Sequence, residues 1–96
     1  MGIIRLYEIC PEAEKAGIEN AVVTGVTDNT AEVKQGSIFV CVKGARFDGH
    51  SAAAEMLSKG AVMIVTDRDI KCGKQLVTDN TRLCLARLLN CFYGKP

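Results

Sequence analysis

Two short, almost uninterrupted apolar runs with a helix-like stretch between them limit how this chain can fold. The runs are residues 37–42 (SIFVCV) and 61–66 (AVMIVT), and the stretch between them is 51–59. Apolar runs of this length without alternation indicate strands that are buried on both faces, as in a parallel sheet. Ser51 is a suitable N-cap and Gly60 a suitable stop, so residues 51–59 are predicted to form a helix. A parallel strand pair joined by a helix is a right-handed βαβ unit.

Two shorter predicted strands and a long helix extend this unit. Residues 21–26 (AVVTGV) are rich in β-branched side chains, and residues 75–77 (QLV) form a brief apolar run, so both are predicted strands. Residues 80–93 carry an apolar stripe at helical spacing and are predicted to form the last helix, with Thr78 or Asp79 as its cap.

The N-terminal segment is predicted to be an interrupted helix. Residues 5–16 are weakly amphipathic, Pro11 should break or restart the helix, and Gly17 is a suitable stop. A chain of 96 residues suits one domain. The order of elements predicts an α/β fold, a small sheet with at least one parallel βαβ unit and helices packed against it.

The composition excludes several classes of protein. Apolar residues make up 48% of the chain and its net charge is +1, which is typical of a folded domain and not of a disordered tail. Lys and Arg are spread among acidic residues and aromatics make up only 5%, so no nucleic-acid partner is expected. No apolar run approaches the roughly 18 residues of a membrane span, so no membrane partner is expected and the chain is predicted to be soluble and cytoplasmic.

The cysteines argue against both a disulfide scaffold and a zinc site. There are five, an odd number without a C-x-x-C pair, and His50 is the single histidine. Disulfide frameworks show an even, patterned set, and Cys/His zinc sites show a regular spacing. We therefore predict five free thiols in a reducing compartment and no metal site. Ser37 and Ser51 lack the context of a nucleophile elbow, so no catalytic residue is assigned.

The sequence contains neither of the common nucleotide-phosphate motifs. G-x-x-x-x-G-K-[ST] and G-x-G-x-x-G are both absent. We therefore expect these residues to hold no cofactor, neither ATP nor magnesium, and the chain alone to be inactive.

Two polar loops, at 27–36 and 44–50, each follow a predicted strand. In open α/β sheets, ligands bind beyond the carboxyl ends of the strands. The first loop offers hydroxyl, carboxylate and amide groups, and in the second Arg46 could meet a phosphate while Phe47 could pack on a flat ring. The two loops are the candidate ligand site, and an ordinary turn with a solvated loop is the alternative.

One pentapeptide, V-T-D-N-T, occurs twice, at 26–30 and 77–81. The residues that follow the two copies differ, so no duplicated domain is inferred. Both copies follow a predicted strand, where Thr, Asp and Asn suit turns and helix caps. The second copy is therefore interpreted as structural.

Residues 27–44 read TDNTAEVKQGSIFVCVKG, and residues 47–50 read FDGH. These stretches resemble the opening domain of Mur ligases, whose run is an acid or Asn, S-R, V-K-P-G-D-L-F-V-A-x-x-G and D-G-H. KGAV at 59–62 resembles the family's K-G-A-x-x-V segment. V-x-D-x-x-R at 77–82 and FYGKP at 92–96 resemble the stretch before the family's ATP domain, and FYGKP is more similar to MurE-type than to MurF-type ligases.

This resemblance, over nearly all of residues 22–96, implies an N-terminal substrate-binding domain spanning residues 1–96. It implies a cytoplasmic, ATP-dependent ligase that adds the third residue of the peptidoglycan stem peptide to UDP-N-acetylmuramoyl-L-Ala-D-Glu. The UDP end of that substrate would bind here. ATP and magnesium would bind to central and C-terminal domains outside these residues. Such a ligase serves peptidoglycan biosynthesis, and with it cell-wall biogenesis, cell shape and cell division.

Carried over by position, the resemblance implies six residues that bind the UDP-sugar. Thr30 keeps the hydroxyl of the family's Ser, whereas Ala31 stands where the family usually has Arg or Lys, Gln35 replaces a common Pro and Ser37 a common Asp. The six implied binding residues are Asp28, Asn29, Thr30, Ala45, Arg46 and Phe47.

Three functions remain open from the sequence. The first is the ligase domain, of MurE type or of the similar MurF type, and the motif run favours it. The second is a non-catalytic α/β module that binds a protein partner, and the third is a small stand-alone enzyme that uses Cys41 or His50. The residues that would select meso-diaminopimelate or lysine as the added amino acid are not among these motifs.

Overall fold

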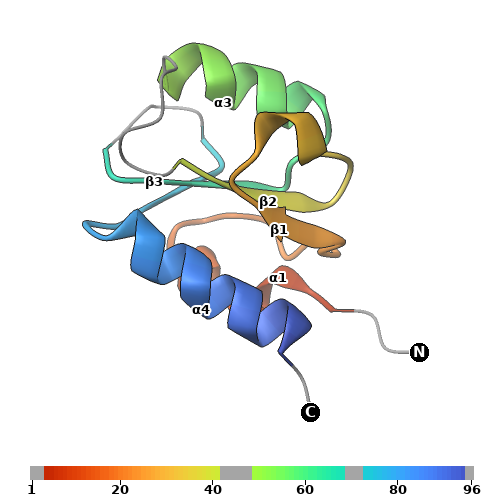
Figure 1. Cartoon of the computed structure of the whole chain (residues 1–96). Coiled ribbons are helices and arrows are strands. Elements are labelled where there is room, and N and C mark those ends of the chain that lie inside the picture. Colours follow the sequence, from red (N-terminus) through yellow and green to blue (C-terminus); the bar gives the residue numbers. More distant parts are fainter. Residues whose placement is uncertain (1–3, 42–48, 69–72, 95–96) are drawn as a thin grey trace.

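The computed structural model describes residues 4–41, 49–68 and 73–94, with only the backbone of residues 49–52. Its centre is a sheet of four parallel strands that lie in sequence order. The strands are β1 (Gly25–Thr27), β2 (Ser37–Val40), β3 (Met63–Thr66) and β4 (Gln75–Val77). Helix α3 (Gly49–Ser58) connects β2 to β3, which confirms the predicted βαβ unit (Figure 1).

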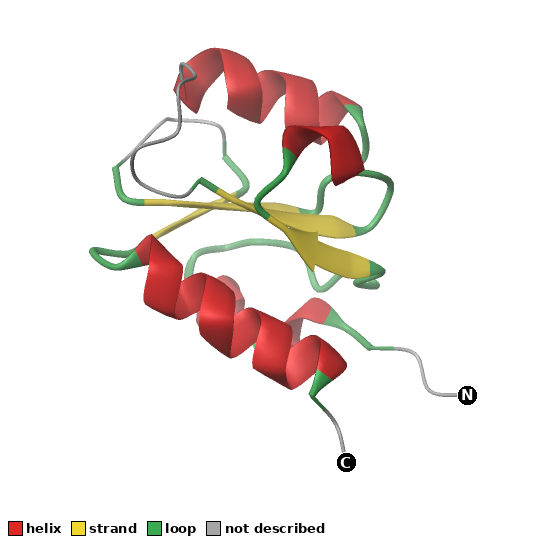
Figure 2. Ribbon diagram, viewed as in Figure 1, coloured by secondary structure: helices red, strands yellow, loops and turns green. Residues whose placement is uncertain are grey.

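Helices cover both faces of the sheet (Figure 2). The short helices α1 (Leu6–Ile9) and α2 (Glu12–Lys15) lie on one face together with the long helix α4 (Thr81–Tyr93). Helix α3 and the single 3₁₀ turn η1 (Thr30–Glu32) lie on the other face. The molecule is therefore a three-layer α/β/α sandwich, which confirms the predicted α/β class of a small sheet with helices packed against it.

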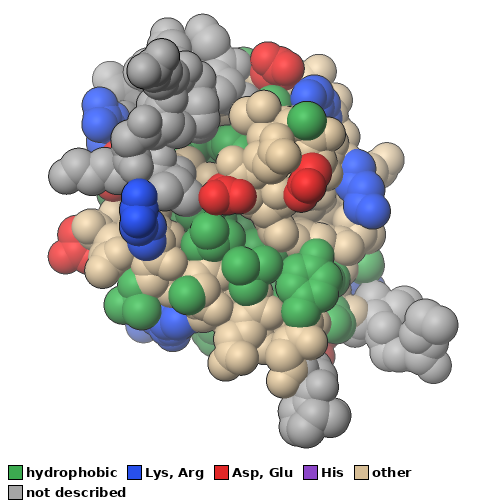
Figure 3. All heavy atoms as spheres, viewed as in Figure 1, with side chains coloured by type: hydrophobic (Ala, Val, Ile, Leu, Met, Phe, Trp, Pro, Cys, Tyr) green, Lys and Arg blue, Asp and Glu red, His purple; other side chains and the backbone are tan. Residues whose placement is uncertain are grey.

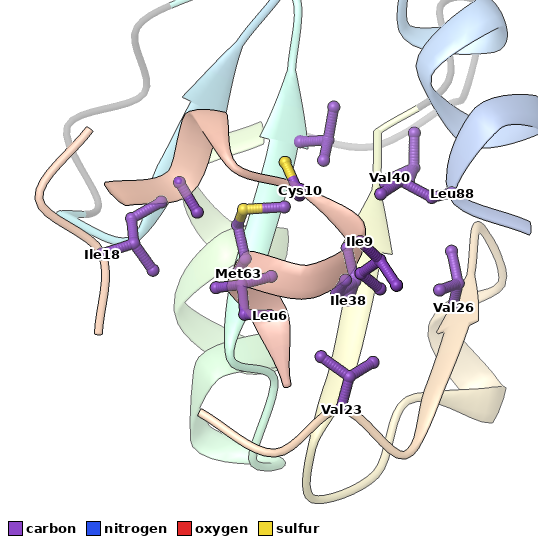
Figure 4. Packing of buried hydrophobic residues seen from close by; sticks show 12 residues of the cluster. Leu6, Ile9, Cys10, Ile18, Val23, Val26, Ile38, Val40, Met63 and Leu88 are labelled. Carbon is purple, nitrogen blue, oxygen red and sulfur yellow. The ribbon is translucent and has the colours of Figure 1, made fainter. Parts of the chain in front are cut away.

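The two central strands are buried on both faces because their side chains alternate between two cores. Ile38 and Val40 of β2 and Met63 of β3 pack under α1 and α4, in the cluster shown in Figure 4. Phe39 and Ile64 point to the opposite face and pack against α3. Every residue of β2 and β3 is buried, which confirms the interpretation of the two apolar runs.

The first strand is shorter than predicted and begins later. The sequence predicted residues 21–26, whereas β1 spans Gly25–Thr27. The reason lies in the backbone hydrogen bonds, since Val23 N donates to Ile4 O at 2.8 Å and Val22 forms an antiparallel bridge with Arg5. Residues 22–23 therefore pair with the N-terminal segment and not with β2.

The two predicted helix caps are wrong, although both helices exist. Helix α3 begins at Gly49, so Ser51 lies inside it and not at its cap. Helix α4 is capped by Asn80, whose Oδ1 accepts from Leu83 N at 3.0 Å, and not by Thr78 or Asp79. Pro11 does interrupt the first helical segment as predicted, because it separates α1 from α2.

Two helices end in the same way, at glycines with positive φ. At Gly60 (φ +107°) the helix closes with Ala61 N donating to Met56 O and Gly60 N to Leu57 O, which is a Schellman motif. Gly17 (φ +77°) closes α2 with the same pair of bonds. The two glycines differ in how much room their surroundings leave for a side chain. A Cβ on Gly60 would lie 2.6 Å from Gln35 Cα, whereas nothing lies within 4 Å of a Cβ on Gly17.

This difference predicts unequal costs for the same substitution. Gly17→Ala should lower the free energy of unfolding by about 1–2 kcal/mol, the penalty of a left-handed conformation for alanine. Gly60→Ala should cost at least about 1 kcal/mol more, because the Gln35 backbone must also move. Urea unfolding of both variants measures the difference. Equal losses would show that the contact with Gln35 does not matter.

Candidate functional site

The predicted ligand-binding turn directly follows β1 and forms its own hydrogen-bond network. Thr27 Oγ1 accepts from Asn29 N at 3.0 Å and donates to Glu32 Oε1 at 3.1 Å. Asn29 Oδ1 accepts from Ala31 N at 3.0 Å and so caps the turn η1. Thr27 and Asn29 therefore fix the turn, which is the structural role that the sequence left as an alternative.

Several polar groups of the turn remain available to a ligand. Asp28 and Asn29 are exposed and Thr30 is half-buried. The Asp28 carboxylate, the Asn29 side-chain NH₂ and the Thr30 hydroxyl make no hydrogen bond to another residue of the described ranges. The turn thus combines a rigid backbone with one acceptor, one amide donor and one hydroxyl at its surface.

The strand that leads to the second predicted loop, β2, pairs with β1. Ala45, Arg46 and Phe47 lie outside the described residues. The strand register places Thr27 opposite Phe39, so the chain leaves β2 next to the end of β1. The two candidate loops therefore follow neighbouring strands, while the contacts of the second loop stay a prediction.

A hollow of about 330 Å³ runs along the outer edge of β1, next to the turn. Hydrophobic side chains gather on this face of the molecule, over β1 and α4 (Figure 3). Tyr93, the last residue of α4, reaches this site, and its hydroxyl lies 3.4 Å from where a Cβ of Gly25 would be. The sequence reasoning missed this hollow, since only the fold brings α4 to β1. Its lining residues are Thr24, Gly25, Val26, Thr27, Glu32, Lys34, Ser37 and Tyr93.

The second copy of the pentapeptide builds the same local structure at the other outer strand. Thr78 Oγ1 accepts from Asn80 N at 3.4 Å, as Thr27 does from Asn29. Asn80 then caps α4 and Thr81 is buried at 3% exposure. The second copy thus serves as a helix cap, which confirms its structural interpretation.

Burial protects two of the described thiols. Cys10, Cys41, Cys84 and Cys91 form no disulfide bond, as predicted, and Cys72 lies outside the described residues. Burial raises the pKa of Cys10 to about 11 and also raises the pKa of Cys84, which keeps both thiols protonated.

Two kinds of feature are absent from the described ranges. These ranges contain no group of three or more His, Cys, Asp or Glu side chains that could hold a metal ion. None of the helices in these ranges is both long and apolar enough to cross a membrane. The side chain of His50 lies outside the description.

Comparison with known proteins identifies the family. The family model described as the Mur ligase family, catalytic domain, matches residues 22–93. The chain belongs to the Mur ligase family. The matched range includes the turn after β1, the whole sheet and α4, so the features described above are those of a Mur ligase.

Curated relatives in the Mur ligase family carry the same name in different bacteria. The chain is 39% identical over 82 residues to a UDP-N-acetylmuramoyl-L-alanyl-D-glutamate–2,6-diaminopimelate ligase of Bacillus licheniformis, covering 84% of this chain and 17% of the relative. It is 37% identical over 75 residues to the ligase of that name from Aquifex aeolicus, covering 77% of this chain and 16% of the relative. The chain thus spans about one sixth of the length of these relatives.

Solved structures of Mur ligases share the fold. A crystal structure of MurF from Acinetobacter baumannii matches 95% of this chain and 21% of its own length, with a TM-score of 0.68 and 22% identity. A second MurF structure from the same organism gives a TM-score of 0.67 at 22% identity, covering 95% of this chain and 22% of its own. At this identity the likeness shows the fold alone.

The pKa of Cys10 predicts that the thiols of this Mur ligase chain react at different rates. At pH 8 we expect iodoacetamide to alkylate Cys10 at least about tenfold more slowly than the exposed Cys91, because the thiolate is the reactive form. Peptide mass spectrometry over a time course measures both rates. In denaturant the rates should converge, and equal rates in the native protein would contradict the assignment of Cys10 to the core.

Proposed function

We propose that this chain binds the UDP moiety of UDP-N-acetylmuramoyl-L-Ala-D-Glu as the N-terminal domain of an ATP-dependent ligase. The ligase would join the third residue of the peptidoglycan stem peptide by an amide bond, in the cytoplasm, and so serve cell shape and cell division. The observation that carries the proposal is the match to ligases named for this substrate, at 39% identity over 82 residues. The MurF-type ligase is less favoured, because its structures match at only 22% identity.

The proposed binding residues come from the two loops beside β1 and β2. The Thr30 hydroxyl, the Asn29 amide and the Asp28 carboxylate can meet the donors and acceptors of a uracil ring. Ala45, Arg46 and Phe47 of the neighbouring loop would complete the site, with the Arg46 guanidinium toward a phosphate. Neutral hydrogen bonds contribute only about 0.5–1.5 kcal/mol each, so we expect this domain alone to bind in roughly the high-micromolar to millimolar range.

The remaining parts of the reaction are assigned outside these residues. ATP would activate the carboxylate of the substrate, and magnesium would balance the charge of its phosphates. The sequence has no phosphate-binding motif of its own, so we propose that both are held by the central and C-terminal domains of a longer ligase. The names of the relatives favour 2,6-diaminopimelate as the added residue over lysine.

The proposal predicts a specific effect of removing the Thr30 hydroxyl. Thr30→Val keeps the shape of the side chain and should weaken binding of UDP-N-acetylmuramoyl-dipeptide by up to about tenfold without unfolding the domain. Backbone amide shifts followed by NMR during a titration measure the affinity and place the ligand. Shifts that cluster away from residues 27–31 and 44–50, or no shifts at several millimolar ligand, would refute the proposed site.

The repeated pentapeptide provides a matched control for this experiment. Asn29 and Asn80 each cap a helical turn at 3.0 Å, Asn29 by accepting from Ala31 N and Asn80 by accepting from Leu83 N. Asn80→Ala should destabilise the domain by about 1 kcal/mol and leave ligand affinity unchanged. Asn29→Ala should weaken ligand binding, because it loosens the turn that carries Thr30. If both variants changed affinity equally, the second copy would also belong to the binding site.

A further inference from the structure

Two adjacent residues at the end of α3 hold both ends of the segment 30–36. Lys59 Nζ donates to the Thr30 carbonyl at 3.0 Å. Gly60 O accepts from Gly36 N at 2.9 Å. The segment begins with the turn η1 and ends where β2 starts. The two residues that follow α3 therefore tie both the turn and the start of β2 to the end of this helix.

The Schellman end of α3 explains why Lys59 reaches Thr30. The absence of a side chain at Gly60 lets the Gln35 backbone approach closely, which brings the segment against the end of the helix. Lys59 also forms an ion pair with Glu55 Oε2 at 3.5 Å, one helical turn earlier, and its side chain is 38% exposed. The ammonium is therefore held by a carboxylate on one side and by the Thr30 carbonyl on the other.

The contact acts on the peptide group next to the Thr30 side chain. The Thr30 carbonyl and the Ala31 N–H belong to one peptide group, and they are bound by Lys59 Nζ and by Asn29 Oδ1. Rotation of this peptide group would break both bonds and loosen the turn that carries the Thr30 hydroxyl. Because an ammonium–carbonyl bond is charge-assisted, it is stronger than a bond between neutral groups.

We infer that Lys59 is a positioning residue for the ligand-binding turn, and that it acts through the Thr30 carbonyl. Since the inference rests on the proposed function, the ligand is a uridine nucleotide. Lys59 orders the turn before the ligand arrives, so that binding does not have to fix the Thr30 peptide. Its effect is on the uridine end of the ligand, through the hydroxyl of Thr30 and the amide of Asn29.

Titrations of the 96-residue chain with uridine and with UDP test this role. Lys59→Met removes the donor and keeps the length of the side chain. It should weaken binding of both ligands by the same factor, about three- to tenfold, since the turn is loosened for either. Lys59→Arg should restore most of the affinity. Glu55→Gln, which removes the ion pair and leaves the bond to Thr30, should bind as the wild type does.

The outcomes separate positioning from direct contact with phosphate. If Lys59→Met weakened only UDP, and lost that effect at high salt, Lys59 would touch the phosphates and the inference would be wrong. Unchanged affinity for both ligands would also overturn it, provided that the wild type binds.

A second measurement does not depend on the ligand. In Lys59→Met the Ala31 amide should shift in the NMR spectrum and exchange faster with solvent, while in Glu55→Gln it should not. If the wild type bound neither uridine nor UDP, the proposed function would fail, and the Ala31 amide would still decide the role of Lys59. An unchanged Ala31 signal in Lys59→Met would overturn the inference.

Discussion

The burial of β2 and β3 on both faces is the constraint on which the rest of this structure depends. Strands without a polar face must be covered by helices on each side, because any uncovered face would expose Ile38 and Met63 or Phe39 and Ile64 to water. All three strand pairs are parallel, and parallel order places all four carboxyl ends at one edge of the sheet. The candidate turn follows β1 at that edge.

The repeated pentapeptide shows how one local sequence serves two purposes. In both copies a threonine hydroxyl accepts from the backbone N–H of the asparagine two residues on, and the asparagine side chain then caps a helical turn. Long helix α4 follows the second copy, and its apolar face buries Leu88 against the sheet, so that copy starts a helix. A single turn and then β2 follow the first copy, so its polar groups stay at the surface. The residues that come after the motif therefore decide whether it serves as a cap or as a candidate binding turn.

The sequence predicts those parts of the fold that depend on short-range patterns. Three such predictions are confirmed: the two apolar strands, the interruption of the helix at Pro11 and the helix stop at Gly60. They could be predicted because periodicity and backbone conformation determine them locally. The start of β1 was wrong because residues 22–23 pair with the N-terminal segment, a contact that no local pattern encodes. For the site, the turn at Asp28–Thr30 follows from its polar residues. The approach of Tyr93 to Gly25 and of Lys59 to Thr30 depends on tertiary structure, although the lysine itself lies in a recognisable K-G-A segment.

The spacing of glycines in this chain reflects the support of the turn more than contact with a ligand. Gly36 has φ +89°, and a Cβ there would lie 2.7 Å from the Thr24 side chain, which also donates to Gln35 O. Gly60 packs on Gln35 from the opposite side. The segment that follows the turn is thus held between β1 and the end of α3, and neither glycine has to touch the substrate for this to hold. These two glycines therefore support a rigid scaffold, and in the proposed site the choice of ligand would depend on the few polar groups at Asp28–Thr30 that this scaffold leaves accessible.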